Sequence, residues 1–331
     1  MSQSWTERKE RGSRFAILLI HGIAKYGGRT LARACLYPIT AYFALLRPRE
    51  RADSMRYLSR ALGRPVGWLD FARHVHTFSA TILDRAFLLS GQLDRFEVAV
   101  SGLETLHRDL DQGRGVLLFG SHLGSFEVLR VLARKRPDYT IRVVLDKSHN
   151  PMVTQLLDAL NPQIAAGVID ASQDGPSIVM AIQQACAEGA LVALLVDRAR
   201  PGEAALPAQF LGQDAWFPTA PWLIASVLKV PVQLGFGLYR GGNRYELLFE
   251  PFAEQVDVPR GQREAALAAL IARYASRLEH VTRSAPFNWF NFYDFWHRPL
   301  PAPPPPVARD DQGAARAGAA VHRAGDGAER G

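Results

Sequence analysis

Short apolar runs alternate with segments of helical spacing along the middle of the chain, between residues 115 and 250. The runs predict buried strands, at Val116–Phe119, Thr140–Leu145, Gly167–Ile169, Leu191–Val196, Val232–Leu238 and Tyr245–Phe249. The helical segments are Gly124–Lys135, Pro151–Leu160, Gly175–Glu188 and Pro218–Leu228. This alternation predicts an α/β fold, with a mostly parallel sheet flanked by helices. The RGGNR turn of residues 240–244 predicts a hairpin at one edge of that sheet.

Helical spacing dominates on both sides of this region. Apolar positions between Ala52 and Leu110 recur at helical intervals, and Glu264–Val281 has the pattern of an amphipathic helix. The stretch Phe287–Trp296, FNWFNFYDFW, is mostly aromatic, which predicts either a final core layer or an aromatic belt at a membrane interface. Residues 301–331 are rich in Pro, Ala, Gly and Arg, a composition that predicts a disordered tail.

Basic residues and two apolar blocks share the amino-terminal part of the chain. The first block, Phe15–Ala24, is shorter than the ~20 residues that a membrane span needs, and the second, Leu31–Leu46, is broken by Arg33 and Pro38. We therefore expect a helical anchor that lies in the membrane surface, with its basic residues on anionic headgroups. A single span and a pair of ordinary core helices remain alternatives.

Composition narrows the class of protein. The chain has 331 residues, 48% of them hydrophobic, which is enough for a sizeable core, and a net charge of +7. Such a charge suits nucleic acid, an anionic membrane or an acidic protein partner. Zinc-finger spacing and RNA-binding aromatic signatures are missing from the sequence, so we expect no nucleic acid partner. Cys35 and Cys186 are isolated in apolar segments, which favours a reducing compartment and small buried side chains.

The stretch Val116–Arg130, VLLFGSHLGSFEVLR, has the strongest chemical pattern. His122 follows a strand directly, and Glu127 lies five residues later in the predicted helix, so both would lie at the carboxyl edge of the sheet. We expect Glu127 to fold back and hold one imidazole nitrogen, which leaves the other free to take a proton. The N–H groups of Leu123, Gly124 and Ser125 would form an anion-binding helix end. A core histidine with a surface glutamate is the alternative that spacing alone leaves open.

Charged residues also follow two other predicted strands. Lys147 comes after the strand that ends at Leu145, and Asp197 and Arg198 come after the one that ends at Val196. These side chains are candidates for holding the phosphate or pantetheine of a substrate. A structural role, with Asp197 as a loop cap, is the alternative.

An ordered set of motifs carries a family resemblance. The segment GSHLGSFE preserves the HxxxxE/D box of glycerolipid-type acyltransferases. The accompanying motifs are Gly113–Gly115, His149–Pro151, Gly189–Asp197, Phe210–Gln213, Pro218–Pro221 and the spaced ending Arg283, Pro286 and Trp289. From about Trp5 to Trp296 the chain resembles the late acyltransferases of bacterial lipid A biosynthesis (the LpxL/HtrB family). The FNWFNFYDFW ending looks like relatives that are encoded with aryl-polyene pigment pathways.

The resemblance implies a membrane-bound O-acyltransferase with a glycerolipid acyltransferase-like fold. It would move an acyl group from an acyl carrier protein thioester to the hydroxyl of a lipid or glycolipid, of the lipid A or aryl-polyene type. His122 would act as general base and Glu127 would orient it, while Gly124, Ser125, Lys147, Asp197 and Arg198 would bind substrate. No cofactor and no metal are implied, and the location would be the cytoplasmic face of the bacterial inner membrane.

The same resemblance divides the chain into four parts. Residues 1–50 would form the anchor, 51–110 a helical region, 111–300 the acyltransferase domain, and 301–331 the tail. The loop Arg200–Phe217 is long and has few regular signals, as functional loops often do. We expect its apolar residues to form one wall of an acyl-chain groove: Phe210, Leu211, Trp216 and Phe217. A loop packed onto the core is the alternative.

Two other functions compete with acyl transfer. A lipid hydrolase or thioesterase would favour the nucleophile elbow G-x-S-x-G, and the order G-S-H-L-G-S lacks it. A non-catalytic membrane scaffold of the same fold is the other alternative, and the intact His122 and Glu127 argue against it.

Overall fold

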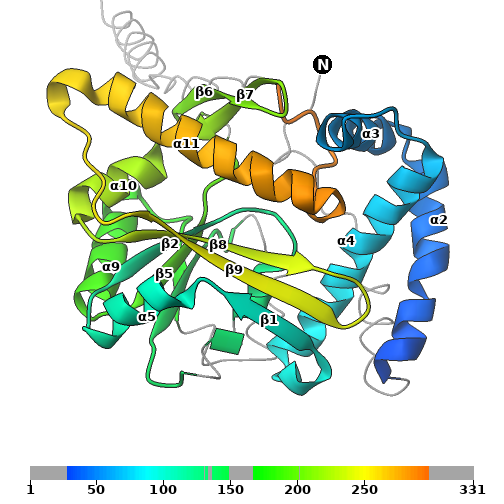
Figure 1. Cartoon of the computed structure of the whole chain (residues 1–331), viewed down its shortest axis with the longest axis horizontal. Coiled ribbons are helices and arrows are strands. Elements are labelled where there is room, and N and C mark those ends of the chain that lie inside the picture. Colours follow the sequence, from blue (N-terminus) through cyan, green and yellow to red (C-terminus); the bar gives the residue numbers. More distant parts are fainter. Residues whose placement is uncertain (1–27, 130, 133–135, 149–166, 201, 298–331) are drawn as a thin grey trace, which may run out of the picture.

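A seven-stranded sheet forms the centre of the molecule (Figure 1). The computed structural model describes residues 28–129, 131–132, 136–148, 167–200 and 202–297. The order of the strands across the sheet is β1-β9-β8-β2-β5-β3-β4. Their bounds are β1 Glu97–Ser101, β2 Val116–Gly120, β3 Ile141–Leu145, β4 Val168–Asp170, β5 Leu191–Leu195, β8 Val232–Tyr239 and β9 Arg244–Ala253. The five strands from β8 to β4 are parallel, so the prediction of a mostly parallel α/β sheet is confirmed.

Helices cover both faces of the sheet, which is why all five residues of β2 are buried. Leu117 and Phe119 pack on one face with the helices α9 (Gly175–Ala187), α10 (Ala220–Leu228) and α11 (Arg263–Ser284). Val116 and Leu118 pack on the other face with α4 (Trp68–Leu89) and α5 (Leu103–Asp111). This alternation follows from the two-residue period of a strand. The apolar run of β2 therefore fits a strand that is buried on both sides.

Two elements differ from the predictions made for their segments. The region between Ala52 and Leu110 is helical in α3 (Pro48–Leu62), α4 and α5, but it also contains the strand β1, which pairs in parallel with β9. The predicted hairpin is present as the antiparallel pair β8–β9. It is not at the edge of the sheet, because β1 forms that edge.

The predicted long loop Arg200–Phe217 is largely a second hairpin, β6 (Ala205–Phe210) and β7 (Gln213–Pro218). Its turn consists of Leu211 and Gly212, with φ of 52° and 81°, a left-handed pair that a two-residue hairpin requires. The backbone N–H of Leu211 donates a hydrogen bond of 2.6 Å to the carboxylate of Glu279 on α11. Phe210, Leu211 and Phe217 are buried in the core beside α11, so they do not form the wall of an open acyl groove.

The aromatic stretch Phe287–Trp296 packs as a final core layer, which decides between its two predicted roles. Trp289, Phe295 and Trp296 are all buried. The ring centroids of Trp289 and Phe295 lie 4.6 Å apart, and Trp289 also contacts Phe210 at 5.0 Å. This layer brings the carboxyl-terminal segment against the β6–β7 hairpin and α11.

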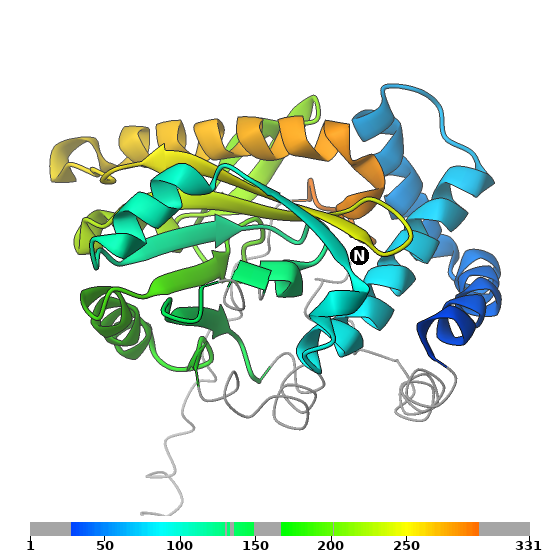
Figure 2. The ribbon, with the colours of Figure 1, turned by 60° about the horizontal axis from the view of Figure 1, so that its bottom comes forward.

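Three helices gather at one side of the sheet (Figures 1 and 2). They are α2 (Leu36–Leu46), α3 and α4, and α4 packs along α2. Within the described residues no helix is both long and apolar enough to cross a membrane. The apolar block Phe15–Ala24, the predicted helix Pro151–Leu160, the motif His149–Pro151 and the tail 301–331 lie outside the described residues.

A buried carboxylate ties the amino-terminal helices to the sheet. Both oxygens of Asp84 on α4 accept hydrogen bonds from Arg29, at 2.7 and 2.8 Å. The hydroxyl of Tyr245 on β9 donates a third at 2.9 Å, and Arg33 lies 3.8 Å from the same carboxylate. Residues 28–34 are therefore fixed to α4 and to the β8–β9 hairpin by ionic hydrogen bonds in a buried setting.

Candidate functional site

His122 and Asp197 leave the sheet side by side. Strands β2 and β5 are parallel neighbours, and Gly120 is the partner of Leu195 in their register. His122 lies two residues beyond Gly120, and Asp197 lies two residues beyond Leu195. The equal offset brings the two side chains together at the carboxyl edge, where parallel sheets place their sites.

The imidazole of His122 and the carboxylate of Asp197 form a hydrogen-bonded pair. Nδ1 of His122 lies 2.8 Å from one oxygen of Asp197, and the backbone N–H of His122 donates to the other oxygen at 3.1 Å. A carboxylate only accepts, so Nδ1 carries the proton and Nε2 of the neutral ring has a free lone pair. Asp197 is completely buried, whereas 36% of the His122 side chain is exposed. The pair can therefore accept a proton from a molecule that reaches Nε2.

Two residues outside the pair contact Asp197. The indole N–H of Trp289 donates to the same oxygen as the His122 backbone, at 3.2 Å. The Nε atom of Arg198 lies 3.7 Å from that oxygen, while another nitrogen of Arg198 donates to the carbonyl of Phe290 at 2.8 Å. The guanidinium of Arg198 also lies over the ring of Tyr293, 5.3 Å from its centroid. The predicted residue Arg198 is thus part of the site, held by the protein itself.

The charges around His122 keep its ring neutral. Burial lowers the pKa of His122, and the positive charges of Arg198 and Arg85 lower it further, against the opposing effect of Asp197. Burial by itself raises the pKa of Asp197, but the contacts with His122 and Arg198 hold that pKa well below its usual range. At neutral pH the site therefore contains a neutral imidazole and an ionised carboxylate, the state that general-base catalysis needs.

Glu127 does not hold the imidazole, and that prediction is wrong. Its carboxylate accepts from the hydroxyl of Ser125 at 2.9 Å and pairs with Nε of Arg85 on α4 at 2.6 Å. The reason lies in the local backbone: the predicted helix Gly124–Lys135 begins as the short 3-10 helix Phe126–Leu129, after Gly124 at a φ of 73°. That turn directs Glu127 toward α4, and Asp197 occupies the position at Nδ1.

The predicted anion-binding helix end at Leu123, Gly124 and Ser125 is wrong for Gly124 and Ser125. The N–H of Gly124 donates to the carbonyl of Asn288, and the N–H of Ser125 donates to the carbonyl of Gly237, both at 2.7 Å. A Cβ on Gly124 would lie 1.9 Å from the Gly237 oxygen, so only glycine fits this close approach of two backbones. These donors fix the turn that carries His122 and are used within the protein.

Lys147 lies at the same edge of the sheet but is not joined to the pair. It follows β3, which is separated from β2 by β5. Its backbone N–H donates to Asp170 at 3.3 Å. A role in holding a substrate phosphate remains a prediction for Lys147.

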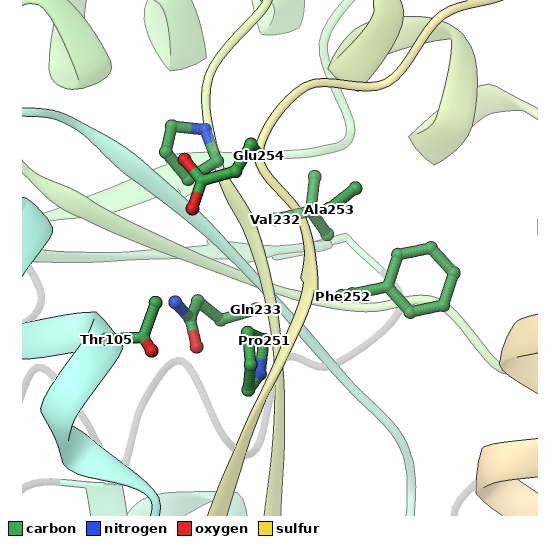
Figure 3. Close-up of a pocket in the computed structure, with 8 residues that line it drawn as sticks. Thr105, Val232, Gln233, Pro251, Phe252, Ala253 and Glu254 are labelled. Atoms are coloured by element: carbon green, nitrogen blue, oxygen red, sulfur yellow. The ribbon is translucent and has the colours of Figure 1, made fainter.

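A small cavity of about 200 Å³ lies elsewhere in the sheet (Figure 3). Thr105, Gln233 and Glu254 line it together with apolar residues. Gln233 is near the amino end of β8, and β8 runs parallel to β2, so the cavity is at the opposite end of the strands from His122. It is not the candidate active site.

Metal chemistry has no evident ligand set in the part of the chain that the structure describes. No group of three or more His, Cys, Asp or Glu side chains there could hold a metal ion.

Sequence reasoning missed two residues of the site, Arg85 and Trp289, as site residues. Arg85 lies in the long helix α4, far from His122 in the chain, and it reaches the site through Glu127. Trp289 was one of many aromatic residues in its stretch, and its bond to Asp197 spans 92 positions in the chain. The signal in the sequence was the spaced ending Arg283, Pro286 and Trp289, which carried the family resemblance but no role for the indole.

Comparison with known proteins gives a family-level match. A family model described as bacterial lipid A biosynthesis acyltransferase matches residues 75–298. The matched region contains His122, Glu127, Asp197 and Trp289, as well as all the strands of the sheet. A search of curated proteins found no match to the chain.

Proposed function

Because the chain belongs to the bacterial lipid A biosynthesis acyltransferase family, and is therefore a lipid acyltransferase, we propose that His122 is the general base of this transfer. The donor is an acyl carrier protein thioester, and the acceptor is a hydroxyl of a lipid or glycolipid. The observation that carries the proposal is the bond from Nδ1 of His122 to buried Asp197, which leaves Nε2 of a partly exposed ring to take the proton.

The proposed reaction needs no acyl-enzyme. The acceptor hydroxyl gives its proton to Nε2 of His122 while its oxygen attacks the carbonyl carbon of the thioester. The carbon–sulfur bond of the tetrahedral intermediate then breaks, and the imidazolium returns the proton to the departing thiolate. The products are an ester and a free thiol. Asp197 stabilises the imidazolium that exists between these steps.

The backbone N–H groups of Gly124 and Ser125 are bonded within the protein, so a positively charged side chain is our candidate for stabilising the oxyanion of the intermediate. Arg85 and Arg198 both affect the pKa of His122, so both place charge near the reacting atoms. The side chain of Arg85 is 26% exposed and that of Arg198 is 12% exposed. We assign the oxyanion to Arg85, the more accessible of the two, with Glu127 holding its guanidinium in place.

The charge and the family of the chain support the proposed carrier and acceptor. The net charge of +7 suits an acidic carrier protein. The family supports a lipid acceptor, and the aromatic ending FNWFNFYDFW adds an aryl-polyene lipid as an alternative to a lipid A-type glycolipid. An acyl transfer assay that supplies each of these lipids in turn distinguishes the two acceptors.

We place the protein on the cytoplasmic face of the bacterial inner membrane through α2 and the start of α4. Leu45, Leu46 and Leu69 are 66%, 62% and 78% exposed. Ala44 packs with Phe71, so these exposed side chains lie at adjoining ends of the two helices. Exposed apolar side chains of this size suit a lipid surface.

A vesicle flotation experiment tests this membrane surface. Leu45→Glu with Leu46→Glu should abolish association with vesicles of phosphatidylethanolamine and phosphatidylglycerol. Val227→Glu is the matched control, because Val227 is 70% exposed on α10, on the opposite side of the molecule from α2 (Figure 1). If both variants float with the vesicles to the same extent, the exposed leucines of α2 do not bind the membrane and the proposal is wrong.

Acyl transfer itself is tested with purified full-length protein in detergent and acyl carrier protein charged with fatty or polyene acyl groups. Mass spectrometry follows acyl loss from the carrier, with lipid A precursors, with an aryl-polyene lipid extract, and without lipid. His122→Ala should abolish lipid-dependent transfer, and His280→Ala, at an exposed histidine of α11, should leave it unchanged. Hydrolysis of the acyl carrier thioester without a lipid product would favour a hydrolase. If the wild-type protein is as inactive as His122→Ala, the non-catalytic scaffold is favoured.

A further inference from the structure

The carboxylate that orients His122 has a second side-chain donor, the indole of Trp289. We propose that Trp289 is a positioning residue of the site, which fixes the Asp197 carboxylate so that one oxygen faces Nδ1 of His122. Oδ1 of Asp197 pairs with Nδ1 at 2.8 Å, whereas Oδ2 accepts from the His122 backbone at 3.1 Å and from the indole at 3.2 Å. The two oxygens are thus held by different partners, so rotation of the carboxylate would break bonds on both.

Trp289 can do this because the surrounding structure holds its backbone. Residues 288–290 form a short antiparallel bridge with residues 122–124. In it, the N–H of Gly124 donates to the carbonyl of Asn288 at 2.7 Å, and the N–H of Phe290 donates to the carbonyl of His122 at 3.3 Å. The same short segment therefore holds the backbone of His122 and supplies the donor to its partner carboxylate.

A buried histidine fixes Trp289 from the other side. Nε2 of His74 on α4 lies 3.1 Å from the carbonyl of Trp289, and Nδ1 lies 2.7 Å from the hydroxyl of Ser54 on α3. The carbonyl only accepts, so Nε2 carries the proton and Nδ1 accepts from Ser54. Burial lowers the pKa of His74 to about 4, so this arrangement is stable at neutral pH. The indole of Trp289 is completely buried and lies 5.0 Å from the ring of Tyr57.

The indole donor has a defined electrostatic effect. It stabilises the Asp197 anion without offering a proton that can be lost, since an indole is a donor only. Loss of the donor destabilises the free anion more than the anion that is paired with an imidazolium. The pKa of His122 should therefore rise when the donor is removed. The other charged groups that face the pair are Arg198 and Arg85. Burial and the negative charge of Asp197 raise the pKa values of the phenols of Tyr274 and Tyr293.

The test compares Trp289→Phe with Trp296→Phe. Trp296 belongs to the same aromatic layer, but its indole donates at 3.1 Å to the carbonyl of Phe210 and not to Asp197. The titration of the His122 ring is followed by NMR, and the pH profile of acyl transfer is measured in parallel. For Trp289→Phe we expect the midpoint for His122 to rise by about half to one pH unit and kcat to fall about 10- to 100-fold, as for loss of a bond to a charged group. Trp296→Phe should leave the His122 titration unchanged.

The proposal is overturned if Trp289→Phe and Trp296→Phe have the same His122 titration and the same pH profile of acyl transfer on the acid side. That result would show that Trp289 only fills the core. If Trp289→Phe does not fold, a benzothienylalanine at position 289 keeps the ring shape and lacks the N–H, and the same titration then decides. The catalytic part of the inference rests on the proposed acyl transfer. The titration does not, so an inactive wild-type protein would refute the transfer while the NMR result still judged the role of Trp289.

Discussion

Two aspartates, Asp84 and Asp197, have the same kind of buried, hydrogen-bonded environment but different roles. Asp84 and Asp197 are both completely buried, and each accepts three hydrogen bonds from groups far away in the chain. The donors to Asp84 are an arginine and a tyrosine, which keep their protons at neutral pH. Asp197 is bonded to a histidine whose outer nitrogen is reachable from solvent. Burial and satisfied hydrogen bonds make a carboxylate rigid, and the partner decides whether that rigidity serves stability or proton transfer.

The largest difference should appear when Asp197 becomes asparagine. Asp197→Asn should lower kcat by about 10³- to 10⁴-fold, because the amide cannot enforce the Nδ1–H tautomer or stabilise the imidazolium. The rate is measured as lipid-dependent acyl transfer with saturating carrier. Asp84→Asn in the same assay should stay within about threefold of wild type per folded molecule, since the hydrogen bonds of Asp84 go to Arg29 and Tyr245 and not to the His122–Asp197 pair. A comparable loss in both variants would mean that the two aspartates are not functionally distinct.

Removal of the other carboxylate should act on stability instead. Asp84→Ala leaves Arg29 unpaired in a largely buried position, where its side chain is 15% exposed. The free energy of unfolding should fall by about 3 kcal/mol, measured by urea denaturation. Asp84→Ala combined with Arg29→Met should recover part of that loss, because the unpaired charge is then gone. No recovery would show that the ion pair is not the source of the effect.

Glu127 tests whether a carboxylate that does not contact the His122 ring still contributes to the rate. Glu127→Gln should lower kcat by about 10- to 100-fold, less than Asp197→Asn, because Glu127 acts through Arg85 rather than on the ring. Arg85→Gln should cost a similar factor, and the double variant little more than either single one. A loss with Glu127→Gln as large as that with His122→Ala would point to direct contact between Glu127 and the imidazole during the reaction.

The smallest expected effect is a shift in pH dependence. The neutral ring is the base, so kcat/KM should rise with pH through the pKa of His122, and burial, Arg198 and Arg85 place that pKa below 6.5. Arg198→Gln removes one charge that lowers the pKa of His122, so the acid limb of the kcat/KM profile should move to higher pH and the rate on that limb should fall a few-fold. A limb that moves to lower pH would contradict the assigned charges.

The features of the site that are set by the strand β2 alone could be predicted from the sequence. The apolar run of β2, the histidine after it and the carboxyl edge all follow from local pattern and parallel-sheet geometry. The pairing of His122 with Asp197 depends on β5 lying next to β2, although β3 and β4 come between them in the chain. Spacing along the chain carries no information about that order, so Asp197 was placed near the site without its partner.

The wrong predictions fall where contacts with distant parts of the chain set the local backbone. The left-handed Gly124 redirects Glu127, and the left-handed Leu211 closes a hairpin without the Asn-Gly or Asp-Gly pair that usually marks one. The strand β1 is a short edge strand with alternating exposure, a weak pattern between two helices. In each case the deciding contact is tertiary, such as the approach of Gly237 to Gly124.

The bridge between residues 122–124 and 288–290 has a consequence for when activity arises. During synthesis, the sheet and the His122 turn leave the ribosome well before Asn288 does. Until residues 288–290 arrive, Asp197 lacks its indole donor and the histidine loop lacks its backbone partners. A nascent chain, or a proteolytic fragment that ends before residue 288, would contain all the strands as well as His122 and Asp197, and would still be inactive. The last described segment to be made completes the site, so the enzyme becomes competent only when almost all of its folded part has been synthesised.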